Sequence, residues 1–299
     1  MASIHGRDLR GEVLPLLGKK LIGLFTQDGN GPAAVAQFFL RHDLPGYEAA
    51  VAENLGTKEE RVTRWPDLQA LKEQRFGPLN YLILLRKTDA GSGHDAEHYR
   101  RMVPGVPDSA FCQRESAANM TSQEVRSVLL GQMGGLLQPG DTVWDIGAGL
   151  GTVSVEIAVL RPDVEVIAAE RDSERVALIR KNRERFDAYN VRVIEGIAPQ
   201  ALEYEQDSPR LIFLGGSGTH LPAILHDVEQ RLRAGGRLLA NFVTLENLMT
   251  AFLRFSGKGW HVEITEVNVA RSDALGGHTG LKPQRGVFIL KADKPGARP

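Results

Sequence analysis

The sequence predicts an α/β protein in which a mostly parallel, doubly wound sheet of seven strands follows a smaller α/β domain. The chain has 299 residues, which corresponds to about two domains at roughly 150 residues each. From residue 142 onward, short apolar runs alternate with helical patterns, as in a parallel sheet covered by helices on both faces. Residues 89–119 are rich in glycine, proline and charge, so we expect a linker there between domains at residues 1–88 and 120–299.

Composition and charge exclude several classes of protein. The chain is 42% hydrophobic and 24% charged, which is typical of globular proteins. Its 36 basic and 37 acidic side chains give a net charge of −1, so no basic field favours binding to nucleic acid. No apolar run approaches the ~20 residues of a membrane span, and the first residues do not resemble a signal peptide. A lone Cys112 cannot form an internal disulfide, so we expect a cytoplasmic protein.

The first segment contains two nearly continuous apolar runs. Leu21–Phe25 and Leu79–Leu85 predict strands that are buried on both faces. Helices are expected between them. The first begins at Pro32 and stops before Pro45-Gly46, and the second runs from about Asp67 to Phe76.

The second segment begins with a predicted helix over Ser122–Leu137 and then alternates strands with helices. The predicted strands are Thr142–Ile146, Val164–Ala169, Val191–Ile194, Leu211–Leu214, Arg237–Phe242, His261–Val269 and Gly286–Leu290. No helical pattern separates the last two strands, so we expect them to form an antiparallel pair.

The strongest chemical signal is a glycine-rich loop, Asp145–Thr152, between a predicted strand and a helix. Glycines let backbone N–H groups approach a ligand, and the helix N-terminus favours its negative end. A dinucleotide fingerprint requires Gly or Ala at the sixth position from Gly147, but Thr152 stands there. The spacing Asp-x-Gly-x-Gly-x-Gly instead resembles the S-adenosylmethionine loop of Rossmann-like methyltransferases. In those proteins the acidic residue, here Asp145, helps hold the methionine end of the cofactor.

A second carboxylate supports a nucleoside ligand. Glu170 ends the second strand 23 residues after Gly147, where a carboxylate can accept both ribose hydroxyls. The alternative is a tight turn with Glu170 capping the next helix, but the loop and the carboxylate occur together in one strand–helix–strand unit. Gly196 and Ala198 follow the third strand, where an adenine would lie, although a simple turn explains them about as well.

The loop after the fourth strand indicates the acceptor. Aminomethyltransferases of nucleic acids usually carry a Pro-Pro-aromatic motif there, whereas this chain has Gly215-Gly216-Ser217-Gly218. Backbone N–H groups in such a loop can bind anions, so we expect an acceptor that presents carboxylates. The alternative is a packing turn without a ligand.

Five stretches of the second segment together resemble the family of carbon-15 methyltransferases and decarboxylases of corrin biosynthesis. They are Met120–Arg126, Asp145–Thr152, Phe213–Gly218, Leu232–Arg237 and Glu266–Arg271. The resemblance implies S-adenosylmethionine as cofactor and a precorrin as substrate, with methylation of carbon 15 and loss of carbon dioxide from an acetate arm. Because the macrocycle supplies the nucleophilic carbon and can accept the electrons of decarboxylation, the reaction requires no metal or covalent nucleophile from the protein.

The first segment is similar to the carboxyl-terminal half of tetrapyrrole carbon-5 methylases. The matching stretches are Ser3–Arg7, Thr26–Pro32 and Glu53–Arg61. The resemblance implies a fused carbon-5 and carbon-15 methyltransferase. In that family the amino-terminal half supplies a glycine-rich cofactor loop that this sequence does not include, so we expect carbon-5 methylation to be impaired and one active site to work.

These motifs and the resemblance give a set of candidate site residues. The cofactor candidates are Thr121, Asp145, Gly147, Ala148, Gly149, Gly151, Thr152, Glu170, Gly196 and Ala198. The substrate candidates are Gly215, Gly216, Ser217, Gly218, Asn241, Arg271 and Arg126, with Lys282 and Arg285 as further cations. His220 and His278 are candidate proton-transfer residues.

Each candidate also has a structural alternative. Thr121 could cap a helix, Asn241 could end a strand in a turn, and each arginine could be a solvated surface charge. His94 and His98 are four residues apart without further ligands, so no metal site is predicted.

The sequence also predicts the partners of the protein and leaves two alternative functions open. We expect a homo-oligomer that binds a precorrin and neither nucleic acid nor membrane. One alternative is another small-molecule or protein methyltransferase on the same scaffold, favoured if the Phe213–Thr219 loop and Arg271 are remote from the methyl group. The other is a cofactor-binding protein without turnover, whose first segment docks a partner.

Overall fold

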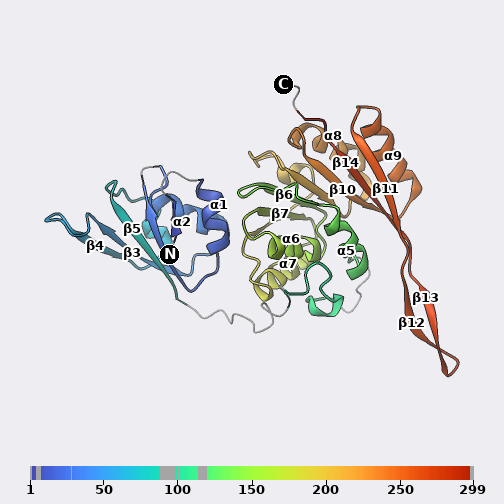
Figure 1. The fold of residues 1–299 in the computed structure, drawn as a ribbon, viewed down its shortest axis with the longest axis horizontal. Coiled ribbons are helices and arrows are strands. Elements are labelled where there is room, and N and C mark those ends of the chain that lie inside the picture. The colour runs from blue at the N-terminus through green and yellow to red at the C-terminus, as the bar shows by residue number, and fades with distance from the viewer. Residues whose placement is uncertain are drawn as a thin grey trace.

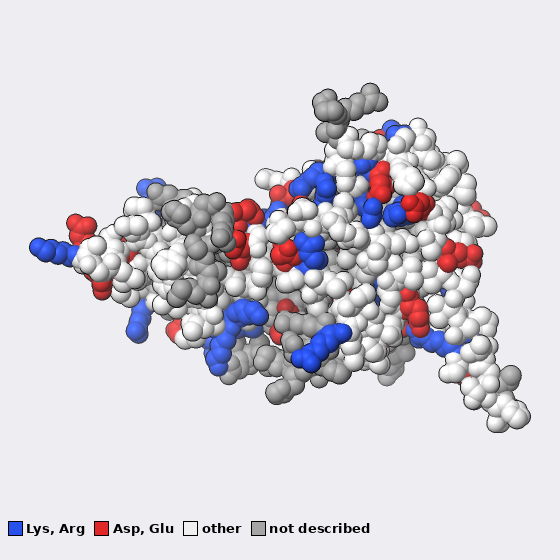
Figure 2. Space-filling view, viewed as in Figure 1, with Lys and Arg blue, Asp and Glu red and all other residues white. Residues whose placement is uncertain are grey.

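Two sheets and a projecting hairpin organise the protein (Figure 1). The computed structural model describes residues 2–4, 8–27, 29–87, 99, 101–113 and 120–296. No helix among these residues combines the length and apolar character that a membrane span requires. Lysine and arginine alternate with aspartate and glutamate on the face shown in Figure 2, where no continuous basic patch forms.

The first domain is a five-stranded sheet with helices on one face. Its strands are β1 (Ala2–Ser3), β2 (Leu21–Thr26), β3 (Tyr47–Glu53), β4 (Arg61–Trp65) and β5 (Asn80–Arg86), in the order β1-β2-β5-β3-β4. Its helices are α1 (Leu9–Val13), η1 (Leu14–Leu16), α2 (Pro32–Arg41) and α3 (Leu68–Leu71). Among the described strands, β1 and β2 pair parallel and the other neighbours pair antiparallel.

Two predictions for this domain need correction. The strands were expected to be buried on both faces, but Ile22 and Leu24 are buried while Leu21 is 66% exposed and Phe25 49% exposed. One face of this antiparallel sheet therefore lacks a helical cover among the described residues. The second predicted helix is also shorter. Asp67 caps its start by accepting a hydrogen bond from the Ala70 N–H at 2.7 Å, and the helix ends four residues after this cap.

The second domain has the predicted doubly wound sheet. Its strands are β6 (Thr142–Ile146), β7 (Glu165–Glu170), β8 (Val191–Glu195), β9 (Leu211–Leu214), β10 (Arg237–Phe242), β11 (His261–Val267) and β14 (Val287–Asp293), in the order β11-β14-β10-β9-β6-β7-β8. Neighbours from β10 to β8 pair parallel, and β14 pairs antiparallel with β10 and β11. The expected seven-stranded, mostly parallel sheet with an antiparallel last pair is confirmed.

Helices cover both faces of this sheet. They are α5 (Gln123–Gly131), α6 (Thr152–Leu160), α7 (Ser173–Arg185), α8 (Leu221–Arg231) and α9 (Leu245–Ser256), with the short helices η2 (Asp108–Ala110), η3 (Gln200–Leu202) and η4 (Gly218–His220). Residues of α5, α6 and α7 pack in one core cluster with Val143 and Val166. Residues of α8 and α9 pack on the opposite face with Trp144 and Ile212.

Several boundaries differ from the predictions, and the last strand runs over Val287–Asp293 instead of Gly286–Leu290. The helix expected over Ser122–Leu137 ends at Gly131, and Gly134 adopts a φ of +58° that a helix does not allow. Part of the expected linker belongs to the second domain, because Val106 and Phe111 are buried in its core. The strand expected over His261–Val269 ends at Val267, and the chain continues into a hairpin of β12 (Ala270–Leu275) and β13 (His278–Pro283).

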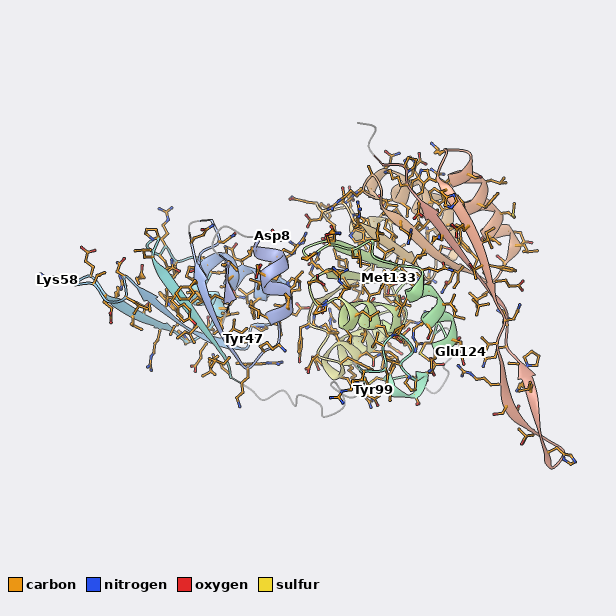
Figure 3. The ribbon with its side chains drawn as sticks, viewed as in Figure 1. Asp8, Tyr47, Lys58, Tyr99, Glu124 and Met133 are labelled. Carbon is orange, nitrogen blue, oxygen red and sulfur yellow. The ribbon has the colours of Figure 1, made fainter. Side chains whose placement is uncertain are left out.

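The two domains contact each other through α1, α2 and the start of β7. Tyr189 of the second domain is 3% exposed and packs within the core of the first domain. Its hydroxyl accepts a hydrogen bond from Arg86 Nη2 at 3.0 Å. Asp8, which caps α1, lies at the same interface (Figure 3). Its carboxylate lies so close to Gly140 that a Cβ added to this glycine would be 2.8 Å from Oδ2. An aromatic side chain and a helix end thus join the domains.

Candidate cofactor and substrate site

A cavity of about 210 Å³ lies at the carboxyl ends of β6, β7, β8 and β9. This edge of a parallel sheet is where doubly wound folds bind their ligands. The lining residues are Ile146, Gly147, Gly149, Ala169, Glu170, Arg171, Arg175, Gly196, Ile197, Ala198, Gly215, Gly216, Ser217, Gly218, His220 and Ile224. The structure therefore brings together the glycine loop after β6, the carboxylate after β7 and the glycine loop after β9.

The first glycine loop needs its glycines for both backbone conformation and space. Gly147, Gly149 and Gly151 have φ values of +72°, +59° and +73°, which favour glycine. A Cβ on Gly147 would lie 2.3 Å from the carbonyl oxygen of Gly216. The two loops therefore touch through backbone atoms alone, and this contact forms one wall of the cavity.

Backbone hydrogen bonds hold the Glu170 carboxylate in place. Its Oε2 accepts a hydrogen bond from the N–H of Gly149 at 2.8 Å, and its Oε1 accepts from the N–H groups of Arg171 at 3.0 Å and Asp172 at 3.1 Å. A carboxylate has about four lone-pair sites, so this carboxylate retains capacity for a ligand hydroxyl. The backbone bonds fix its orientation before any ligand binds.

Asp145 lies beneath the first loop and is fully buried. Its Oδ2 accepts a hydrogen bond from the Ser154 hydroxyl, whereas its Oδ1 has no hydrogen-bond partner among the described residues. Burial raises the pKa of the Asp145 carboxyl to about 7. A free buried acceptor beside the glycine loop suits the ammonium group at the methionine end of S-adenosylmethionine. Asp145 itself is not among the residues that line the cavity. The glycine loop and Glu170, which do line it, together with this free acceptor fit the cofactor that the loop predicts.

The other cofactor candidates occupy several positions. Gly196 and Ala198 line the cavity, and Thr152 is a buried first residue of α6. Ala148 lies in the loop, and its N–H donates to the Ala169 carbonyl oxygen at 3.0 Å. Thr121 does not line the cavity; its carbonyl oxygen accepts a hydrogen bond from Arg126.

Among the substrate candidates, the loop of Gly215, Gly216, Ser217 and Gly218 lines the cavity. His220 lines it as well, so it lies near the expected reacting atoms. Asn241 does not line the cavity, although its buried Oδ1 has no hydrogen-bond partner among the described residues.

The prediction that Arg126 contacts substrate is wrong for this structure. Its side chain is fully buried, and its Nε donates to Glu156 at 2.7 Å while Nη1 donates to Asp108 at 2.8 Å. Nη2 donates to the Val106 carbonyl oxygen at 2.6 Å. Every nitrogen of the guanidinium is thus occupied inside the protein, and Arg126 joins α5 to α6 and η2.

Arg271 lies on the hairpin and not at the cofactor cavity. Its Nε donates to Glu124 Oε1 at 2.9 Å and its Nη2 donates to Glu124 Oε2 at 2.7 Å, with Asp108 Oδ2 at 3.1 Å. Figure 3 shows Glu124 where the hairpin leaves the body. Arg271 lines a separate hollow of about 580 Å³. None of the described residues lines both this hollow and the cofactor cavity.

The remaining candidates lie on the hairpin or outside the described residues. His278 is exposed on β13, so the structure does not bring it to the cofactor cavity. Lys282 faces Asp273 across the hairpin at 3.6 Å. Arg285 is exposed and follows β13. His94 and His98 lie outside the described residues.

Sequence reasoning missed Arg171 and Arg175, which both line the cavity. Their positions give a signal that could have found them. Arg171 directly follows Glu170 at the carboxyl end of β7, and Arg175 follows one helical turn later. Side chains at the carboxyl end of a parallel strand lie at the ligand edge of the sheet.

Comparison with known proteins agrees with this geometry. Residues 113–294 match the family described as "Precorrin methyltransferase domain". The chain belongs to the precorrin methyltransferase family. This match spans the cofactor cavity, both glycine loops and the hairpin, and it begins within the segment that packs on the second domain.

Relatives of the precorrin methyltransferase family are of two lengths. A Sinorhizobium protein named "Precorrin-6Y C(5,15)-methyltransferase [decarboxylating]" is 31% identical over 95% of this chain and 65% of the relative. The chain therefore spans about two thirds of that relative's length. A Salmonella typhimurium protein named "Cobalt-precorrin-6B C(15)-methyltransferase (decarboxylating)" is 31% identical over 63% of this chain and 96% of the relative.

Solved structures match the second domain. The crystal structure of a precorrin-6Y C5,15-methyltransferase from Geobacter metallireducens is 35% identical, with a TM-score of 0.58, over 64% of this chain and 96% of that chain. A structure titled precorrin 8W decarboxylase, from Methanobacterium thermoautotrophicum, is 31% identical with a TM-score of 0.55, over 62% of this chain and 98% of that chain. The Rossmann-like methyltransferase fold of the second domain is therefore confirmed.

Proposed function

We propose that the second domain transfers a methyl group from S-adenosylmethionine to carbon 15 of a precorrin and promotes loss of carbon dioxide from an acetate arm. One observation carries the proposal. The two glycine loops and Glu170 line one cavity, and this cavity lies in a domain that matches nearly the full length of relatives named as carbon-15 methyltransferases.

The chain's own residues would bind and orient the reactants. Bound S-adenosylmethionine would supply an activated methyl group. Glu170 would accept hydrogen bonds from the ribose hydroxyls, and Asp145 would face the ammonium group at the opposite end of the cofactor. Transfer to a carbon nucleophile is an in-line displacement, so most of the catalysis comes from positioning and from exclusion of water.

Decarboxylation needs a place for an electron pair and a source for one proton. When carbon dioxide leaves the acetate arm, the conjugated macrocycle takes up the electron pair, and a proton later replaces the lost carboxyl on that carbon. His220 lines the cavity and can transfer protons by residue type, so we assign it to this step.

The test is an anaerobic incubation of the purified protein with S-adenosylmethionine and a precorrin-6-type substrate, followed by product mass. We expect one added methyl and one lost carbon dioxide. Glu170→Ala should abolish turnover, whereas Glu203→Ala, which changes an exposed carboxylate outside the cavity, should retain it. Cofactor binding without any mass change would contradict the proposal, and two added methyls would show carbon-5 methylation as well.

A further inference from the structure

Arg171 is a free cation at the mouth of the cofactor cavity. Its side chain is exposed and reaches toward the loop after β9, with Nη1 3.7 Å from the position of a Cβ on Gly218. Among the described residues, its guanidinium has no hydrogen-bond or ion-pair partner. Neighbouring Arg175 differs, because its Nε is 3.7 Å from Asp172 Oδ2.

The two carboxylates that flank Arg171 in the sequence are occupied elsewhere. Glu170 is 5% exposed and accepts three backbone N–H groups. Asp172 caps α7 by accepting the N–H groups of Glu174 at 3.0 Å and Arg175 at 3.2 Å. Neither carboxylate neutralises Arg171, so its positive charge is available to a ligand.

The loop opposite Arg171 adds hydrogen-bond donors. The N–H of Gly215 donates to the Ile146 carbonyl oxygen at 3.0 Å. The N–H groups of Gly216, Ser217 and Gly218 have no acceptor among the described residues. Consecutive free N–H groups opposite a guanidinium favour an anion over a neutral group.

The size of the cavity indicates where this anion comes from. Its volume of about 210 Å³ is below the roughly 300–1,000 Å³ of typical ligand pockets. With a cofactor in a cavity of this size, we expect the macrocycle of a tetrapyrrole to lie across the mouth. The groups that meet Arg171 are then the acidic side chains at the periphery of the ring.

We propose that Arg171, facing the Gly216–Gly218 loop, binds a carboxylate side chain of the tetrapyrrole and so orients the ring over the methyl group. This inference rests on the proposed function, because it presumes a tetrapyrrole acceptor. The inference assigns the substrate contact that was expected of Arg126 and Arg271 to Arg171, which lines the cofactor cavity itself. An arginine suits the role, since its guanidinium binds carboxylates through two parallel hydrogen bonds.

The test measures binding of two ligands separately. Uroporphyrin, with eight carboxylates, serves as the tetrapyrrole probe in fluorescence titrations, and S-adenosylmethionine binding is followed by calorimetry. Arg171→Gln should weaken uroporphyrin binding about tenfold, the effect of losing one charge-assisted hydrogen bond, and change cofactor affinity less than twofold. Arg171→Lys should retain part of the affinity, because it keeps the charge and loses the paired geometry.

Arg180→Gln is the matched control, because Arg180 is also exposed on α7 but does not line the cavity. It should leave both affinities unchanged. An equal loss of uroporphyrin binding in Arg180→Gln, or a loss confined to S-adenosylmethionine in Arg171→Gln, would overturn the assignment. So would failure of the unmodified protein to bind uroporphyrin. If the probe binds through Arg171 but no precorrin is methylated, the proposed function fails and the carboxylate site stands.

Discussion

Asp145 shows how one buried residue can make ligand binding depend on pH. Burial, with a smaller effect from the charge of Glu170, raises its pKa from 3.8 to about 7, although the Ser154 hydroxyl lowers it in part. Near neutral pH the carboxyl therefore exchanges between a neutral and a charged form. Only the charged form would attract the ammonium group that we propose Asp145 faces, so under that proposal cofactor binding should be weaker below pH 7.

This residue yields a prediction with a defined sign. Affinity for S-adenosylmethionine should rise as pH rises through about 7, and Asp145→Asn should remove that dependence. Stability of the free protein should change in the opposite direction. Between the ordinary pKa of 3.8 and about 7, the folded state holds a proton that the unfolded state releases, so the free energy of unfolding falls with rising pH.

Calorimetry at pH 6, 7 and 8 measures the affinity, and urea unfolding at the same pH values measures the stability. The slope from Asp145 is at most about 1.4 kcal/mol per pH unit. If the unmodified protein binds the cofactor equally at pH 6 and pH 8, Asp145 does not face the ammonium group.

At the scale of elements, two arginines that both bond to Asp108 should differ in their contributions to stability. Arg126 is fully buried between Glu156 and Asp108 and lies over the Phe111 ring, 5.0 Å from its centroid. Arg271 bonds to Glu124 and Asp108 from an exposed hairpin. A buried ion pair that loses one partner leaves a charge without compensation, whereas an exposed pair contributes little.

Arg126→Met should therefore lower the free energy of unfolding by about 3–5 kcal/mol. Arg271→Gln should lower it by about 0–1 kcal/mol, since water replaces the lost contact. Urea denaturation of both variants measures the difference. A similar loss of unfolding free energy in the two variants would mean that burial does not determine how much each arginine's ion pairs stabilise the protein.

The same elements show what the sequence can predict. Strands β6, β7 and β9 are buried at every residue, so their apolar runs mark them almost to the residue. Strand β3 (Tyr47–Glu53) contains three alanines and few strand-forming side chains, and it was missed. The carboxylates of the expected substrate make Arg126 a candidate, and the sequence does not reveal that its partner is Glu156, because that residue lies 30 positions away. Arg171 follows Glu170 at the carboxyl end of β7, which is a local signal, but its proximity to the loop at Gly218 is visible only in the folded structure.

At the scale of the whole molecule, the interface between domains combines an aromatic side chain with buried charge. Glu165 is buried at the start of β7, with Arg10 Nη2 at 2.6 Å, Arg192 Nε at 3.1 Å and His42 Nε2 at 3.4 Å. Burial alone would raise the pKa of Glu165, but the neighbouring His42 imidazole and the Arg10 and Arg192 guanidinium groups outweigh it and lower the pKa. The carboxylate is therefore charged, and its partners come from both domains.

Tyr189 gives this interface a test. Tyr189→Ala should remove packing from the first-domain core and cost about 3–5 kcal/mol, as for other large aromatic truncations. In calorimetry we expect one unfolding transition in the unmodified protein and two in the variant. Tyr204→Ala changes a tyrosine that is 88% exposed and should leave the single transition intact. One unshifted transition in both variants would show that Tyr189 does not couple the domains.

The position of β14 also determines the order in which the molecule can form during synthesis. Strand β11 has β14 as its neighbour in the sheet, and β14 also pairs with β10. A ribosome therefore has to release residues up to Asp293 before the antiparallel edge of this sheet can close. The last described strand of the first-domain sheet, β5, ends at Arg86, so the described strands of that sheet can pair much earlier. A nascent chain arrested between β11 and β14 would carry a folded first domain beside an open sheet edge, which is a state prone to aggregation.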